Sequence, residues 1–178
     1  MKSLINKLKE KGLRISAAES CTGGLVSKMI TDISGASEVF DCAVTTYSNE
    51  AKIKLLGVDP QTLATFGAVS EQTAREMALG VRNLSGADIA VSVTGIAGPT
   101  GAVPNKPVGT VCIGLATAEK CYAKTFLFEG TRAQVRRLSA KMACKMVLNE
   151  LGEDSFDENI IKKSIKKAKT AVKKQKNS

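Results

Sequence analysis

The stretch AAESCTGGLV, residues 17–26, lies where a short apolar segment gives way to a helical pattern. The residues LRISAA at 13–18 predict a buried strand. Apolar residues beyond the two glycines follow helical spacing, and we expect Ser20 or Thr22 to cap this helix. A buried strand followed at once by a helix is typical of α/β folds. The predicted apolar face of the helix consists of Leu25, Val26, Met29, Ile30 and Ile33.

The same alternation continues along the chain. Apolar and β-branched residues predict further strands at 39–48, 88–95, 108–116 and 121–128. Helical spacing and capping residues predict helices at 2–11, at 49–58 with Gly57 at its end, after Asp59, after Ser70 and at 131–151. The last helix is expected to face the core through Val135, Leu138, Met142, Met146 and Leu148. We therefore predict a single α/β domain over residues 1–152, a three-layer α/β/α sandwich with a mixed sheet.

The composition is that of a globular protein. Hydrophobic residues make up 43% and charged residues 24% of the 178 positions, which suits one domain with a sizeable core. No apolar run approaches the roughly 18 residues of a membrane-spanning helix, and the charged N-terminus lacks a signal-peptide core. These features predict a cytoplasmic protein. The five cysteines are scattered without a CxxC pair, which predicts reduced thiols and neither disulfides nor a zinc site.

The chain contains no histidine. Within one chain, this excludes a Ser-His-Asp triad, a Cys-His pair and every His-ligated metal site. Any general base must therefore be a lysine, an acidic residue, a tyrosine or a terminal amine. We predict neither a metal site nor a cofactor.

Two residues of the opening stretch are candidate nucleophiles. Cys21 is intrinsically the better nucleophile, but the chain has no histidine to deprotonate it, and a small core residue is the alternative interpretation. Ser20 needs a base even more, and lysine is the best-known alternative to histidine. Lys52 follows the second predicted strand, so both side chains lie at one end of the sheet if the two strands are neighbours. A catalytic lysine must be neutral, whereas the ordinary interpretation of Lys52 is a solvated helix residue.

Two glycine-bearing loops follow predicted strands, ESCTGG at 19–24 and TGIAGPTG at 94–101. Backbone N–H groups at such strand ends and helix N-termini can bind a phosphate or an amide carbonyl. Turn formation alone is the competing interpretation. The candidate ligand contacts in these loops are Cys21, Thr22, Gly23, Gly24, Gly95, Ala97 and Gly98.

Three further side chains are candidates for the same site. Arg132 and Arg136 are four residues apart at the start of the last predicted helix and share one face. A guanidinium suits a phosphate or carboxylate, and pairing with acids elsewhere in the protein is the alternative. Tyr47, one of only two tyrosines, is expected to hydrogen-bond a lysine or a developing oxyanion, or to anchor the strand end.

Six motifs occur in order along the chain and together resemble the CinA C-terminal domain family. The resemblance covers roughly residues 1–150, and the best-defined members of this family are nicotinamide-nucleotide amidohydrolases. The motifs are AESCTGG (18–24), TYSNEAK (46–52), GAVSE (67–71), GIAGP (95–99), KPVGTV (106–111) and GTRAQVRR (130–137).

The resemblance implies an α/β/α domain that forms homo-oligomers. It implies hydrolysis of the carboxamide of nicotinamide mononucleotide to nicotinate mononucleotide and ammonia, without a metal. Ser20 and Lys52 match the family's catalytic serine and lysine. Tyr47, Thr22 and the surrounding glycines match its substrate pocket. Because some relatives with this fold lack the activity, a non-catalytic nucleotide-binding or regulatory module is the alternative.

Residues 153–178 are a separate, lysine-rich zone. The segment from Asn159 to Ser178 holds eight lysines and no acid, while the rest of the chain has 18 basic and 17 acidic residues. Its apolar residues predict an amphipathic helix, with a disordered tail as the alternative. Such a tail can contact an anionic partner, and an adaptor that binds nucleic acid through it is a third interpretation of the protein. The apolar stripe is Ile161, Ile165, Ala168 and Val172.

Overall fold

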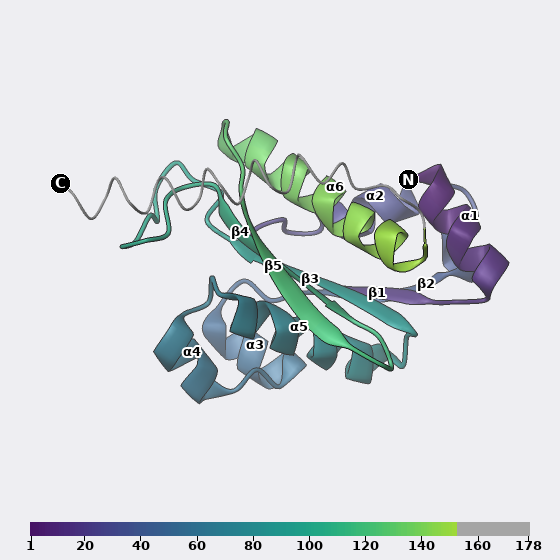
Figure 1. Ribbon diagram of the computed structural model, residues 1–178, viewed down its shortest axis with the longest axis horizontal. Helices are drawn as coiled ribbons and strands as arrows, with labels where there is room; N and C mark the ends of the chain where they lie inside the picture. The colour runs from purple at the N-terminus through teal and green to yellow at the C-terminus, as the bar shows by residue number, and fades with distance from the viewer. Residues whose placement is uncertain (153–178) are drawn as a thin grey trace.

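Strand β1 (Ile15–Glu19) lies inside a five-stranded sheet of order β2-β1-β3-β4-β5 in the part of the chain that the structure describes, residues 1–152. This computed structural model is drawn in Figure 1. Strands β2 (Phe40–Thr45) and β3 (Ile89–Gly95) run parallel to β1 on either side. Strands β4 (Thr110–Ala116) and β5 (Cys121–Leu127) add an antiparallel edge. The predicted mixed sheet is therefore confirmed.

Helices cover both faces of the sheet, which makes the predicted three layers (Figure 1). One face carries α1 (Lys2–Lys11), α2 (Leu25–Thr31) and α6 (Arg132–Glu150). The other carries α3 (Asn49–Leu56), α4 (Pro60–Phe66) and α5 (Glu71–Ser85). A short 3-10 turn, Ala36–Glu38, precedes β2. None of the helices in residues 1–152 is long and apolar enough to cross a membrane. The predicted lysine-rich helix or tail lies outside the described residues.

Alternation along β1 divides the core into two clusters. Successive side chains of a strand point to opposite faces of its sheet. Ala17 belongs to the larger cluster, under α1, α2 and α6, whereas Ala18 belongs to the smaller cluster with Leu56 and Met77. This alternation continues past the end of β1, where it sets the directions of the next side chains.

Several predicted helix ends are confirmed. Gly57 closes α3 in the left-handed conformation, Asp59 caps α4 and Ser70 caps α5. One prediction is wrong: neither Ser20 nor Thr22 caps α2, because its N-cap residue is a glycine that offers no side chain. The carboxylate of Glu19 takes over the capping role. It accepts hydrogen bonds from the N–H groups of Gly24, Val26 and Ser27.

The predicted core face of the last helix is correct except at one position. Val135, Met142, Met146 and Leu148 are buried, but Leu138 is 40% exposed. Its position falls between the stripe that faces the sheet and the solvent side of α6. A stretch of helix with apolar residues on several sides does not fix its buried stripe by sequence alone.

Gly80 allows α5 to pack directly on α3. A Cβ atom built on Gly80 would lie 1.9 Å from the carbonyl oxygen of Leu56, so the two helix backbones are in contact there. Gly80 occupies the interior of α5, where an unhindered glycine-to-alanine change stabilises a helix by about 1 kcal/mol.

We predict that Gly80→Ala lowers the free energy of unfolding instead of raising it. The added methyl group forces α5 away from α3, and overpacking of this kind costs about 1–3 kcal/mol. Urea unfolding of the wild type and the variant measures the change. Leu84→Ala, which alters a 58% exposed side chain of the same helix, is the control. A Gly80→Ala protein as stable as the wild type or more stable would show that the helices do not touch at this residue.

Candidate active site

Ser20 and Lys52 meet at the carboxyl ends of β1 and β2. Ser20 directly follows β1, and Lys52 lies in the first turns of α3, just after β2. Because these strands are parallel neighbours, both residues reach the same edge of the sheet, as the sequence predicts. The Lys52 Nζ atom is 3.3 Å from the Ser20 Oγ atom. Nζ also donates to the carbonyl oxygens of Thr46, at 2.9 Å, and Ser48, at 3.4 Å.

Lys52 is not the solvated helix residue that its sequence context favours. It is 1% exposed, and no carboxylate forms an ion pair with it among residues 1–152. Burial lowers the pKa of Lys52 from its ordinary value of 10.5, since desolvation penalises the charged form. The negative charge of Glu50 and the Cys21 thiol act in the opposite direction and are weaker causes. The amino group therefore loses its proton more readily than a solvated lysine.

Glu19 lies beside the Ser20–Lys52 pair and is fully buried. Because side chains alternate, its carboxylate points to the α2 face while Ser20 reaches Lys52 of α3 on the other. Beyond its three backbone donors it accepts from the Ser27 hydroxyl at 2.6 Å. Four donors satisfy the buried charge and hold the start of α2 close to the end of β1.

The Cys21 thiol is part of the core. It is 6% exposed and packs in the larger hydrophobic cluster. Burial raises the pKa of Cys21 to about 12, although the nearby Arg136 charge works against this rise. A thiol with this pKa is almost entirely protonated at neutral pH, so it is a poor nucleophile.

The turn after Ser20 leaves two backbone donors unused. The N–H of Ser20 donates to Val93, that of Gly23 to the Ser20 carbonyl, and that of Gly24 to Glu19. Within residues 1–152, no carbonyl oxygen accepts from the N–H groups of Cys21 and Thr22, although the Cys21 N–H also lies beside its own thiol. They remain available to a negatively charged oxygen.

The second glycine loop is built by close packing. A Cβ atom on Gly95 would lie 2.7 Å from a methyl group of Val111 and 2.8 Å from the Thr110 carbonyl oxygen, so β3 and β4 require a glycine there. Gly98 has a φ of 81°, and Ala97 is buried in the larger cluster. Turn and packing requirements therefore account for these loop residues.

Both predicted arginines reach the site, but they bond oxygen atoms of the loops. Arg132 donates to the Gly98 carbonyl at 2.8 Å and to the Tyr47 hydroxyl at 3.0 Å. Arg136 donates to the carbonyls of Cys21, at 3.0 Å, and Thr22, at 2.7 Å. Tyr47 is 65% exposed and bonds Arg132, not Lys52. The arginines thus join α6 to three segments around Ser20: the turn after β1, the segment after β2 that carries Tyr47, and the loop after β3 that carries Gly98.

Sequence reasoning missed Glu19 and Thr46. Glu19 ends a buried strand, and a carboxylate in that position needs several donors, which is the signal that could have found it. Among residues 1–152, the hydroxyls of Thr22 and Thr46 are the buried side-chain polar atoms without a hydrogen-bond partner. Thr22 follows Ser20 by two residues, and the Thr46 carbonyl accepts a hydrogen bond from Lys52, so both threonines are neighbours of the Ser20–Lys52 pair.

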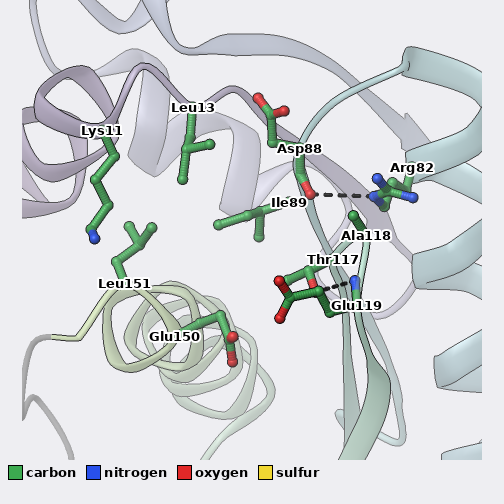
Figure 2. Close-up of a pocket in the computed structure, with 10 residues that line it drawn as sticks. All are labelled: Lys11, Leu13, Arg82, Asp88, Ile89, Thr117, Ala118, Glu119, Glu150 and Leu151. Carbon is green, nitrogen blue, oxygen red and sulfur yellow. Dashed lines mark hydrogen bonds between the residues drawn. The ribbon is translucent and has the colours of Figure 1, made fainter.

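The cavity in Figure 2 is separate from this site. It has a volume of about 280 Å³ and is lined by Leu13 and Ile89, at the amino ends of β1 and β3. Ser20 lies at the opposite, carboxyl end of β1. A groove of about 530 Å³ between α2 and α6 comes closer, because Arg136 forms part of its wall, but neither lining includes Ser20 or Lys52.

The protein is a three-layer α/β domain in which Ser20, directly after β1, meets the buried Lys52 of α3. Residues 1–151 match the model of the CinA C-terminal domain. The chain belongs to this family.

Named relatives agree with this assignment. A competence-damage inducible protein of Thermoanaerobacter pseudethanolicus is 50% identical over 83% of this chain, and a CinA-like protein of Kosmotoga olearia is 49% identical over the same share. The chain spans 36% of each of these relatives.

Two crystal structures are similar in fold. The competence/damage inducible protein of Agrobacterium tumefaciens is 41% identical with a TM-score of 0.82, covering 85% of this chain and 93% of that one. The competence or damage-inducible protein of Enterobacter asburiae is 38% identical with a TM-score of 0.82, covering 84% and 94%. The α/β/α expectation is thus confirmed.

We predict that Lys52 makes stability rise with pH. Its folded-state pKa is lowered, so the unfolded chain binds more protons as the pH approaches 10.5, and the free energy of unfolding increases over this window. As the pH falls below the folded-state pKa, this contribution is lost. The difference in unfolding free energy between wild type and Lys52→Met, measured by urea unfolding from pH 7 to 10.5, is expected to move in favour of the wild type.

Lys54→Met removes an exposed lysine from the same helix and is the matched control. A wild-type-minus-Lys52→Met difference that stays constant or falls as the pH rises would contradict a buried lysine with a lowered pKa.

Proposed function

We propose that this protein hydrolyses the carboxamide of nicotinamide mononucleotide, giving nicotinate mononucleotide and ammonia for pyridine-nucleotide salvage. Ser20 is the nucleophile and Lys52 the general base. The single observation that carries the proposal is the 3.3 Å contact between the Ser20 Oγ atom and a buried lysine that forms no ion pair with a carboxylate of residues 1–152. The substrate comes from the resemblance of the six sequence motifs to nicotinamide-nucleotide amidohydrolases.

Acylation needs a base that accepts the serine proton. Neutral Lys52 takes the proton from the Ser20 hydroxyl as Oγ attacks the carboxamide carbon. The resulting ammonium group is held by the carbonyls of Thr46 and Ser48, which accept from Nζ. When the C–N bond breaks, Lys52 returns this proton to the departing nitrogen, and ammonia leaves. An ester between Ser20 and the nicotinoyl group remains.

The carbonyl oxygen becomes negatively charged during this attack. The unused N–H groups of Cys21 and Thr22 are the proposed donors to it. A donor of this kind typically contributes about 100- to 1,000-fold to turnover. Ser20 and both donors belong to one turn, so nucleophile and oxyanion site are placed together.

Deacylation repeats the chemistry with water. Lys52, neutral again after ammonia leaves, accepts a proton from a water molecule that attacks the ester carbonyl. The Ser20 oxygen leaves and regains a proton from the lysine ammonium. The free carboxylate of nicotinate mononucleotide is released.

Arg132 is the proposed contact for the substrate phosphate. It lies on the exposed rim, and its bonds to Gly98 and Tyr47 leave other N–H donors of the guanidinium available. The Tyr47 hydroxyl, which accepts a hydrogen bond from this arginine, is proposed to contact the substrate from the same side. The predicted self-association of the protein remains a proposal.

We predict that the purified protein releases ammonia from nicotinamide mononucleotide with a chelator present. Ser20→Ala is expected to lose at least about 1,000-fold in kcat, because nothing replaces the nucleophile. Cys21→Ala is expected to keep most of its turnover, because the thiol is buried and protonated. Ammonia is measured with a coupled assay and folding by circular dichroism.

Undiminished turnover by Ser20→Ala, or a large loss in folded Cys21→Ala alone, would overturn the serine mechanism. A wild-type protein that binds the nucleotide but releases no ammonia would favour the alternative, a non-catalytic nucleotide-binding or regulatory module.

A further inference from the structure

We propose that Arg136 is a positioning residue that orients the oxyanion donor, and that it does not bind the substrate phosphate. Its guanidinium holds the peptide between Cys21 and Thr22 so that the Thr22 N–H points toward the Ser20–Lys52 side of the turn. This inference rests on the proposed serine–lysine hydrolase, whose oxyanion donors it explains.

Two successive carbonyl groups converge on one guanidinium. The Nε atom of Arg136 donates to the Cys21 oxygen at 3.0 Å, and Nη2 donates to the Thr22 oxygen at 2.7 Å. Two bonds in the fixed geometry of a guanidinium restrain direction as well as distance. Arg136 therefore fixes the orientation of two neighbouring peptide planes.

Peptide planarity transmits this restraint to the N–H groups. In a trans peptide the N–H points away from the carbonyl oxygen of the same plane. Since the Cys21 oxygen faces Arg136 of α6, the Thr22 N–H faces away from α6. Helix α6 covers one face of the sheet and α3, which carries Lys52, covers the other (Figure 1). The free Thr22 N–H is thus directed to the side on which Lys52 meets Ser20.

The next peptide follows the same pattern. The Thr22 oxygen also faces Arg136, so the Gly23 N–H points away from it, and there it donates to the Ser20 carbonyl at 3.1 Å. This bond in turn fixes the Ser20–Cys21 peptide, whose N–H is the second free donor. One side chain on α6 therefore sets the direction of both unused donors.

Gly23 leaves room for the guanidinium. A Cβ atom at this position would lie 3.2 Å from Nη2 of Arg136, and Gly23 has a φ of 55°, which side chains rarely adopt. Beyond it, Gly24 is bonded to the buried Glu19 carboxylate. The turn is therefore held by a cation at its centre and an anion at its end.

The contacts of Arg136 also argue against a phosphate role. Nε and one terminal nitrogen are committed to carbonyl oxygens, and the side chain is half-buried between the turn and α6. A side-on bidentate contact of Nε and Nη2 with a phosphate would require these two bonds to break. Arg132, one helical turn earlier and on the exposed rim, keeps free donors for that purpose.

The test compares the wild type with Arg136→Met and Arg136→Lys. We expect Arg136→Met to lower kcat about 100-fold, the typical effect of one misplaced oxyanion donor, with little change in the Kd for nicotinate mononucleotide measured by calorimetry. Arg136→Lys keeps the positive charge but lacks the planar pair of N–H donors. Its kcat is therefore expected to lie between those of Arg136→Met and the wild type. Arg137→Met, at the exposed neighbouring arginine, is the control.

A rise of tenfold or more in the product Kd with kcat preserved would overturn the inference, because it would identify Arg136 as a phosphate contact. Full recovery of kcat by Arg136→Lys would also overturn it, since charge alone would then suffice.

Amide hydrogen exchange separates this inference from the proposed function. Loss of the guanidinium is expected to speed exchange of the Gly23 and Gly24 amide protons, which are bonded in the ordered turn. If the wild type has no hydrolase activity, the proposed function fails. The exchange rates of Gly23 and Gly24 then still test whether Arg136 orders the turn. Unchanged exchange in Arg136→Met would overturn the positioning role, whether or not the protein is an enzyme.

Discussion

The burial of the Lys52 amino group against the Ser20 hydroxyl is the contact on which the proposed chemistry of this protein depends. A charged ammonium in such a place requires compensation, and its hydrogen-bond partners within residues 1–152 are one hydroxyl and two carbonyl oxygens. Neutral oxygens offset the loss of hydration less well than a carboxylate would, so burial shifts the equilibrium towards the free amine. In a chain without histidine, this shift favours the proposed role of Lys52 as a base, although lysine is ordinarily protonated at neutral pH.

The sheet brings these groups together through its register. Parallel pairing of β1 with β2 places Ser20 and the start of α3 at one edge. The alternation of side chains then sends Glu19 to one face and Ser20 to the other. Consequently the Glu19 carboxylate stabilises the backbone of the turn and does not pair with Lys52, whose pKa burial lowers more than the Glu50 charge raises it. An exchange of these two directions would place the carboxylate beside the lysine and raise its pKa.

The fold could be predicted because it follows from strong local patterns, whereas the roles of Ser20 and Lys52 came from the family resemblance, since the local context of Lys52 alone favours a solvated lysine. Continuous apolar strands and capping residues such as Ser70 indicated the alternating elements, and the strand-end positions of Ser20 and Lys52 indicated their meeting. The helix cap by Glu19, the exposure of Leu138 and the carbonyl partners of Arg136 could not be predicted. Each depends on which side chains of distant segments converge after packing, and no spacing within the sequence encodes that convergence. The lysine-rich segment lies outside the described residues, so its predictions stay open.

The protonation state of Lys52 is the property that most directly decides whether it can act as a base. Nitrogen-15 NMR of the lysine side chains, with the Lys52 signal assigned by its loss in Lys52→Met, would follow this single amino group through a pH titration. We expect its midpoint to lie below the ordinary lysine value of 10.5. A midpoint at or above 10.5 would mean that the buried group stays charged, and Lys52 could not then accept the proton of Ser20.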